Sequence, residues 1–406
     1  MNIINEEKND KIKNKILNLS FNQDNSCFSV STEKGFMIFT TYPYKRFHKR
    51  KMDGGIRHCE MLNRTNLLAL IGGGEFPKFN PKKIVIWDDF QNKMISEIKF
   101  FSNIKNIKLK KDRIFVVFEK NIYIFDLKTL ENIEIIHTND NPKGLFAINN
   151  DPNKTVIVYL GKFDKDTTNH KGSIIIKNYY KEKYIRIIAH KNGVSYISIN
   201  NDGTLLATSN EKGTTIKIFN CNNGNLLSYF KRGNEKAEIN YICFDNLSNY
   251  LAVTSDRGTI HIWSLGDVIE KLKIIKEEKE EIKKIDNKKE EENEDEKNDK
   301  NDNEINKNKI NIEQDKDEKN EINEVLNSQL PKNKKHIFSH SERSFAQIKI
   351  NSNKSICSFQ KNNIIIVITY EGMYYQAQLD TNNGGLCKII YTESLSNLQN
   401  INNKIK

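Results

Sequence analysis

The 406-residue chain has no hydrophobic run long enough to cross a bilayer. A spanning helix needs about 20 apolar residues in succession, and the most apolar stretch, residues 364–370, has the length of one strand. The N-terminal residues also lack the apolar core of a signal peptide. These absences argue against a helical membrane protein and predict a chain that is soluble or peripheral to a membrane.

Cysteine is sparse and scattered. The six cysteines form no Cys-x-x-Cys pair, so neither a zinc site nor a disulfide framework is indicated, and they suit a reducing cytosol as small core residues. No nucleophile has a plausible base, and the glycines at 72–74 precede a Glu-Phe-Pro turn rather than a helix. We therefore expect a protein that is not an enzyme and that needs no cofactor or metal.

A repeat dominates what the chain does contain. Most repeats follow one another at steps of 39 to 51 residues, near the period of roughly 40 to 45 typical of four-stranded propeller blades. The last step is 114 residues, so one blade should carry an insertion. The pattern predicts an all-β, seven-bladed β-propeller of the WD40-like kind. Its seven turn-plus-strand units are 32–39, 82–87, 119–125, 172–177, 211–219, 256–263 and 371–375.

The insertion is marked by its composition. Residues 266–340 are rich in Lys, Glu, Asn and Asp and nearly devoid of aromatics. Such a segment buries too little apolar surface to offset its conformational entropy, so we expect a long disordered loop within blade six. The expected organisation is an N-terminal tail (1–13), blades one to six (14–265), this loop (266–340), the end of blade six with blade seven (341–395) and a C-terminal tail (396–406).

Charge is divided unevenly along the chain. Residues 276–324 hold 12 lysines and 20 acidic residues, a net charge of −8, so the rest carries +19 against +11 for the whole chain. A body this basic should seek phosphates in lipid headgroups or nucleic acid. Codon-driven enrichment in Lys and Asn is an alternative source of the charge. Aromatics are not interleaved with the basic residues, so nucleic acid is not expected as a partner.

The dipeptide Lys231-Arg232 lies between two of the repeats. Successive side chains of an extended segment point to opposite sides, so the two cations would serve two separate anion pockets. A dipeptide of this kind, taken alone, is more often a solvated turn.

Three stretches follow one another along the chain: Leu68–Pro77 leading into Pro81–Asp89, then Ala189–Tyr196 with 202–208 and 211–214, and finally Phe230–Gly233. In this order and spacing they resemble the PROPPIN family, seven-bladed β-propellers that bind polyphosphoinositides. The resemblance covers nearly the whole chain outside the insertion, and the Phe-Lys-Arg-Gly run is similar to the family's Phe/Leu-Arg-Arg-Gly signature. The resemblance therefore implies a peripheral membrane protein.

The resemblance implies two lipid pockets that flank the dipeptide. One would lie between blades five and six, and the other would use blade five. Two departures from the family, Lys231 for Arg and Asn210 for Ser, weaken the second pocket, so we expect the first to bind more tightly. The threonines and histidines also have ordinary structural roles as alternatives. The implied residues are Arg232, Ser255, Thr259 and His261 for the first pocket and Lys231, His190, Thr214 and Lys217 for the second.

The family also carries a membrane-contacting loop and a partner-binding groove. In the loop, Val268, Ile269, Leu272 and Ile275 fall on one helical face; a short helix that caps the blade is the alternative, and residues 322–330 are a weaker anchor candidate. The groove near blades two and three would bind acidic segments of autophagy proteins. Its candidate residues are Lys108, Lys110, Lys111 and Arg113, which otherwise form a solvated face.

Together these features predict an effector of phosphatidylinositol 3-phosphate, the 3,5-bisphosphate, or both. Two pockets on one edge would give strong recruitment only where such lipids are dense. The expected location is the cytoplasm, with recruitment to endosomal, vacuolar, preautophagosomal or plastid membranes. The alternative function is a WD-repeat scaffold that binds proteins without lipid specificity.

Overall fold

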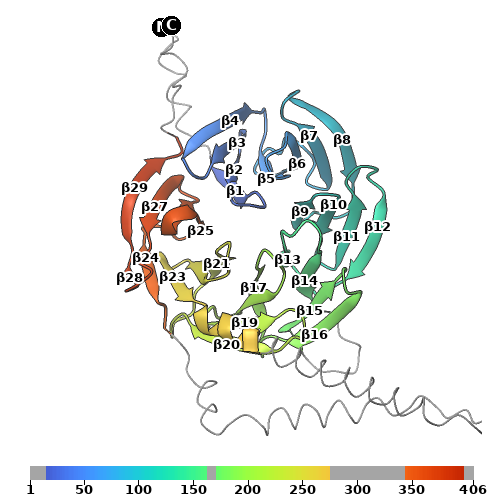
Figure 1. Cartoon of the computed structure of the whole chain (residues 1–406). Coiled ribbons are helices and arrows are strands. Elements are labelled where there is room, and N and C mark those ends of the chain that lie inside the picture. The colour runs from blue at the N-terminus through green and yellow to red at the C-terminus, as the bar shows by residue number, and fades with distance from the viewer. Residues whose placement is uncertain (1–14, 162–170, 275–342, 397–406) are drawn as a thin grey trace, which may run out of the picture. The chain divides into compact units, whose positions relative to one another are not determined.

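The computed structural model describes residues 15–161, 171–274 and 343–396, and it divides the chain into two units. One unit comprises residues 1–265 and 343–406, and its described strands form seven sheets arranged as a ring, antiparallel except for one short parallel pair in blade six (Figure 1). The other unit is residues 266–342, of which 266–274 are described and helical. The predicted all-β propeller with seven blades is confirmed.

The first four blades each take four consecutive strands. Blade one is β1 (Ile16–Phe21), β2 (Cys27–Thr32), β3 (Gly35–Thr40) and β4 (Lys45–Lys51). Blade two is β5 (Ile56–Met61), β6 (Leu67–Gly72), β7 (Lys83–Asp88) and β8 (Lys93–Lys99). Blade three is β9 (Asn106–Lys110), β10 (Arg113–Val117), β11 (Asn121–Asp126) and β12 (Asn132–His137). Blade four is β13 (Phe146–Ile148), β14 (Val156–Leu160), β15 (Ser173–Asn178) and β16 (Lys183–Ile188).

The last three blades follow the same plan with one addition: the short strand β28, which lies between two strands of blade seven in the sequence, joins the sheet of blade six. Blade five is β17 (Val194–Ile199), β18 (Leu205–Asn210), β19 (Thr215–Asn220) and β20 (Leu226–Lys231). Blade six is β21 (Ile239–Phe244), β22 (Tyr250–Ser255), β23 (Thr259–Ser264) and β24 (Ala346–Lys349), with β28 (Gly385–Leu386) parallel to β24. Blade seven is β25 (Ser355–Phe359), β26 (Ile364–Thr369), β27 (Met373–Gln378) and β29 (Lys388–Ser394), with the 3-10 turn η2 (Lys361–Asn363) before β26.

The seven sequence repeats correspond to the third strands, β3, β7, β11, β15, β19, β23 and β27. The insertion is also where the pattern predicted it, because β23 pairs directly with β24 although about 80 residues separate them in the chain. The predicted disorder of this loop falls mainly on residues 275–342, which lie outside the described residues.

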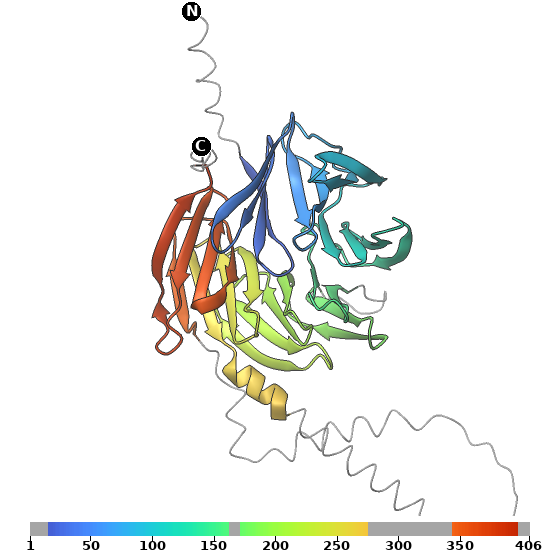
Figure 2. The ribbon, with the colours of Figure 1, turned by 45° about the horizontal axis from the view of Figure 1, so that its top comes forward.

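The core is built between neighbouring blades, where alternate apolar residues of facing sheets pack together. Blades one and seven close the ring in this way: Leu19, Phe28 and Ile366 belong to one buried cluster, and the Tyr374 hydroxyl donates to the Thr41 carbonyl at 2.7 Å. Figure 2 shows these two blades side by side. All six cysteines are buried free thiols, as expected of small core residues. Among the described residues, no helix has the length and apolarity that a membrane crossing requires.

Candidate functional site

The end of strand β20 directs its side chains to two different blades. Phe230 is buried and stacks on Trp263 of blade six, with ring centroids 5.4 Å apart. Lys231, the next residue, is exposed and pairs with Thr215 across the β19–β20 ladder. Since neighbouring side chains of a strand alternate, Lys231 lies on the face turned toward blade four. The same alternation would turn Arg232 toward blade six, and the use of the two cations in two separate pockets stays a prediction.

On the blade-six side, Arg232 is buried and partly engaged within the protein. Its Nε donates to the Gly213 carbonyl and its Nη2 to the Glu235 carbonyl, both at 2.5 Å. Gly213 has φ +65°, and a Cβ there would stand 2.1 Å from the Ala237 carbonyl, so the turn requires glycine. Burial, followed by the nearby positive charge of Arg257, lowers the pKa of Arg232. An arginine has five N–H donors, and its contacts with the described part of the chain use two of them, which leaves three for a ligand.

The hairpin β22–β23 carries the other predicted residues of this side. His261 lies close enough to Arg232 that burial, followed by this positive charge, lowers the pKa of its imidazole to about 4. The ring is therefore neutral at pH 7, with Nδ1 3.1 Å from the Ser344 hydroxyl. Ser255 is buried at the end of β22 and Thr259 begins β23. Of these three residues, His261 is the one whose electrostatic interaction with Arg232 is established, and a shared pocket with Ser255 and Thr259 stays a prediction.

On the blade-four side, Lys217 and His190 form a compact pair. The Lys217 ammonium donates to the Ala189 carbonyl at 2.9 Å, and His190 Nε2 is 2.9 Å from the Thr208 hydroxyl. Burial, followed by the charge of Lys217, lowers the pKa of His190 to about 4. Burial also lowers the pKa of Lys217. The site thus offers an exposed lysine, a second lysine with hydrogen-bonding capacity to spare and a neutral imidazole.

Asn210, one of the two departures from the family pattern, forms the turn between β18 and β19 with its side chain. Its Oδ1 accepts the backbone N–H groups of Thr214 and Thr215 at 2.9 and 3.1 Å, and its Nδ2 donates to the Thr214 hydroxyl at 3.0 Å. The Thr214 hydroxyl keeps its own hydrogen for another acceptor. Asn210 is therefore a turn-forming residue, which holds Thr214 at the start of β19.

Arg257 is a neighbour of the site that the sequence interpretation missed. It lies in the turn between Ser255 and Thr259, and its Nη2 donates to the Lys236 carbonyl at 2.8 Å and stands 3.5 Å from the Glu235 carboxylate. The signal was present in the sequence, because the Asp-Arg-Gly-Thr turn places this cation between two predicted ligands.

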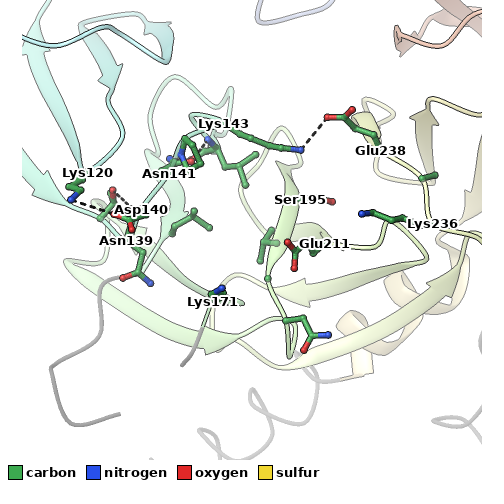
Figure 3. Close-up of a pocket in the computed structure, with 18 of the residues that line it drawn as sticks. Lys120, Asn139, Asp140, Asn141, Lys143, Lys171, Ser195, Glu211, Lys236 and Glu238 are labelled. Atoms are coloured by element: carbon green, nitrogen blue, oxygen red, sulfur yellow. Dashed lines mark hydrogen bonds and ion pairs between the residues drawn. The ribbon is translucent and has the colours of Figure 1, made fainter. Parts of the chain in front are cut away.

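A cavity of about 1600 Å³ opens beside these turns, bordered by the loops of blades three to six (Figure 3). Its charges are mixed. Lys143 reaches across to Glu238 at 3.2 Å, and Lys120 lies 3.8 Å from Asp140. Arg257 is also among the lining residues, so the cavity borders the Arg232 side. No sequence pattern pointed to this cavity.

The four candidate groove residues near blades two and three do not form one exposed basic surface, which corrects that expectation. Lys110 is buried, and its ammonium donates to the Asn149 and Lys154 carbonyls at 3.2 and 2.9 Å. Burial lowers its pKa to about 8. Lys108 forms an ion pair with the buried Glu60 at 3.1 Å.

The other two groove residues remain near the surface. Arg113 lies over the Tyr179 ring at 5.2 Å, and Lys111 is exposed. The four cations are close in the sequence, but in the fold their side chains contact different neighbours.

The candidate membrane segment is described only in its first part. Residues 266–274 are helical, as both alternatives required, with Ile269 and Leu272 half-buried. Val268 is 2% exposed, and a side chain this buried is not available to a bilayer. Ile275 and the second candidate, residues 322–330, lie outside the described residues.

Comparison with known proteins gives consistent matches. The PROPPIN family model matches residues 16–278. SVP1-like protein 2 of Candida glabrata is 32% identical over 281 residues, which cover 62% of this chain and 63% of that protein, less than two thirds of its length. Autophagy-related protein 18 of Yarrowia lipolytica is 28% identical over 93% of this chain and 96% of its own. The solved structure of Kluyveromyces lactis Hsv2 with complete loop 6CD has a TM-score of 0.68 at 21% identity, covering 94% of this chain and 100% of that chain, and it supports the fold.

Proposed function

Since the chain belongs to the PROPPIN family, we propose that it is a phosphoinositide effector that binds phosphatidylinositol 3-phosphate, the 3,5-bisphosphate, or both. The lipid phosphates would be held on the two sides of Lys231-Arg232, by Arg232, Ser255, Thr259 and His261 on one side and Lys231, His190, Thr214 and Lys217 on the other. The protein would act by binding, without a catalytic step.

One observation supports the proposal: Lys231 is exposed at the end of β20, whereas the next residue, Arg232, is buried and acts on His261, so the two neighbouring cations have different surroundings. Cationic and hydroxyl donors that converge from several strands are what a phosphate needs for multiple charge-assisted bonds. Arg232 adds a planar fork with three uncommitted N–H groups, which suits two-point contact with phosphate oxygens.

Two sites on one rim would turn weak contacts into selective recruitment. A single headgroup pocket of a few charge-assisted bonds gives about micromolar affinity. Once one pocket is occupied, the second binds from the same membrane, which multiplies residence by a factor on the order of 10². The proposed role is recruitment of autophagy-related or vesicle-trafficking proteins to endosomal, vacuolar, preautophagosomal or plastid membranes. Partners with acidic segments would use the exposed Lys111 and the neighbouring Arg113.

The test is co-sedimentation with vesicles at physiological salt, comparing phosphatidylinositol 3-phosphate, the 3,5-bisphosphate and the 4-phosphate. We expect binding to the first two but not to the third, and loss of binding in Lys231→Thr/Arg232→Thr. The matched control is Lys45→Thr/Arg46→Thr, which removes the same Lys-Arg pair from β4 on the opposite side of the ring (Figure 1).

Two results would contradict the proposal. Binding that ignores the position of the phosphate and falls equally in both double variants would reduce the site to a general basic surface. No binding to any vesicle would favour a scaffold that recognises proteins only.

A further inference from the structure

The turn that follows Arg232 is held between two arginines. Arg232 donates to the Glu235 carbonyl, and Arg257 donates through Nε and Nη2 to the Lys236 carbonyl at 3.3 and 2.8 Å. The Glu235 carboxylate stands 3.5 Å from Arg257 Nη2, and its charge also acts on Arg232. A carboxylate therefore lies beside both guanidinium groups at the edge of the proposed phosphate pocket.

Two acidic residues lie close to Arg232, and they differ in how firmly they are fixed. Asp256 accepts the Glu238 backbone N–H at 3.0 Å, and its own N–H donates to the Glu238 carbonyl, so it belongs to the turn. The Glu235 side chain is 81% exposed and its partner Arg257 is 50% exposed. An exposed ion pair of this kind is weak and is easily exchanged for a stronger anion.

We propose that Glu235 is an internal competitor for the phosphate at the Arg232 site, and that Arg257 becomes a ligand of that phosphate when the carboxylate is displaced. The inference rests on the proposed function and deepens it, because it adds Arg257 to the pocket and names Glu235 as a residue that lowers the affinity of the pocket for phosphate. The ligand class is a phosphate monoester on inositol, whether in a lipid or in a soluble headgroup. A phosphate carries more charge and more acceptor oxygens than a carboxylate, so it wins the exchange.

The test uses the full chain and two forms of the ligand, vesicles containing phosphatidylinositol 3-phosphate and soluble inositol 1,3-bisphosphate. Glu235→Gln should tighten binding of both about threefold, and Arg257→Gln should weaken it about threefold, as exposed ion pairs allow. In the Arg257→Gln background, Glu235→Gln should have a clearly smaller effect, because the carboxylate has lost its ion-pair partner and then acts only through the charge of Arg232.

Glu238→Gln is the matched control. It removes one negative charge from the same turn, but the Glu238 carboxylate pairs with Lys143 across the cavity (Figure 3) rather than with Arg257. We expect it to leave headgroup affinity unchanged. Equal gains from Glu235→Gln and Glu238→Gln would mean a general charge effect and would overturn the inference.

The remaining outcomes separate this inference from the proposed function. If the wild type binds in a way that Lys231→Thr/Arg232→Thr abolishes but Glu235→Gln changes nothing, only the inference fails. A gain on vesicles without a gain on the soluble headgroup would place the effect at the bilayer surface and also overturn it. Absence of any wild-type binding overturns both.

Discussion

The Lys231 side and the Arg232 side of blade five differ in how much of their positive charge is already engaged within the protein. Lys231 is exposed at the end of its strand. Arg232 is buried, closes the turns at Gly213 and Glu235, and has carboxylates nearby. We therefore expect Lys231 to respond to a ligand without a structural cost, whereas Arg232 would have to support the fold and bind the ligand at the same time. Two adjacent residues of one motif thus differ in how much they contribute to the stability of the fold.

The largest expected effect concerns whether both sides are needed on a membrane. We expect Lys231→Ala to reduce binding to vesicles containing phosphatidylinositol 3-phosphate by a factor on the order of 10², because two-point attachment is lost. Titration of the same variant with soluble inositol 1,3-bisphosphate should lose one of two sites and keep the other. Unchanged vesicle binding in Lys231→Ala would mean that the Arg232 side binds the membrane alone and that the Lys231 side is not a lipid site.

The next effect in size is on the free energy of unfolding, which should depend on Arg232 more than on Lys231. Arg232→Ala leaves two carbonyls of the turn without their donors, so we expect the free energy of unfolding to fall by about 2 kcal/mol. Lys231→Ala should change it by less than about 0.5 kcal/mol, because its side chain is exposed. Urea denaturation followed by fluorescence measures both, with Arg232→Lys as the variant that keeps the charge and one donor. Equal stability of the two alanine variants would remove the structural role assigned to Arg232.

The blades could be predicted from the sequence because each third strand is a β-rich run that follows a turn residue. The sequence also suggests that Lys231 and Arg232 point to different sides, an expectation that depends only on the alternation of a strand and stays a prediction. Burial and partners depend on which loops meet in space. Lys108 and Lys110 are two residues apart, yet one pairs with Glu60 of blade two and the other with carbonyls of blade four. No local pattern contains those neighbours.

The pH dependence of binding sharpens the comparison at the histidines. In the free protein the pKa of His261 is about 4, and a bound phosphate should raise it, so the complex takes up a proton as pH falls. Binding should therefore be helped by His261 increasingly as pH falls below the raised pKa of the complex, until about pH 4, where the free protein also takes up the proton. Phosphate itself loses charge over this range, with a second pKa near 6, so the quantity to measure is the affinity ratio of wild type to His261→Gln.

We expect that ratio to rise several-fold as pH is lowered, and soluble headgroup titration at several pH values measures it. His190→Gln provides the comparison on the other side, where Lys217 also opposes protonation of the ring. A ratio that stays constant with pH would mean that His261 remains neutral in the complex and contributes only a hydrogen bond.

The smallest expected effect comes from making the two sides chemically alike. Lys231→Arg replaces a point charge with a planar fork, which should tighten the Lys231 side about threefold in soluble headgroup titration. Lys45→Arg on β4 makes the same exchange away from both pockets and should change nothing. Because Lys231 is exposed, the longer side chain meets no packing obstacle. If Lys231→Arg gains nothing, the donors around it do not converge well enough to use a fork, and the weakness of that side lies in its geometry rather than in its residue type.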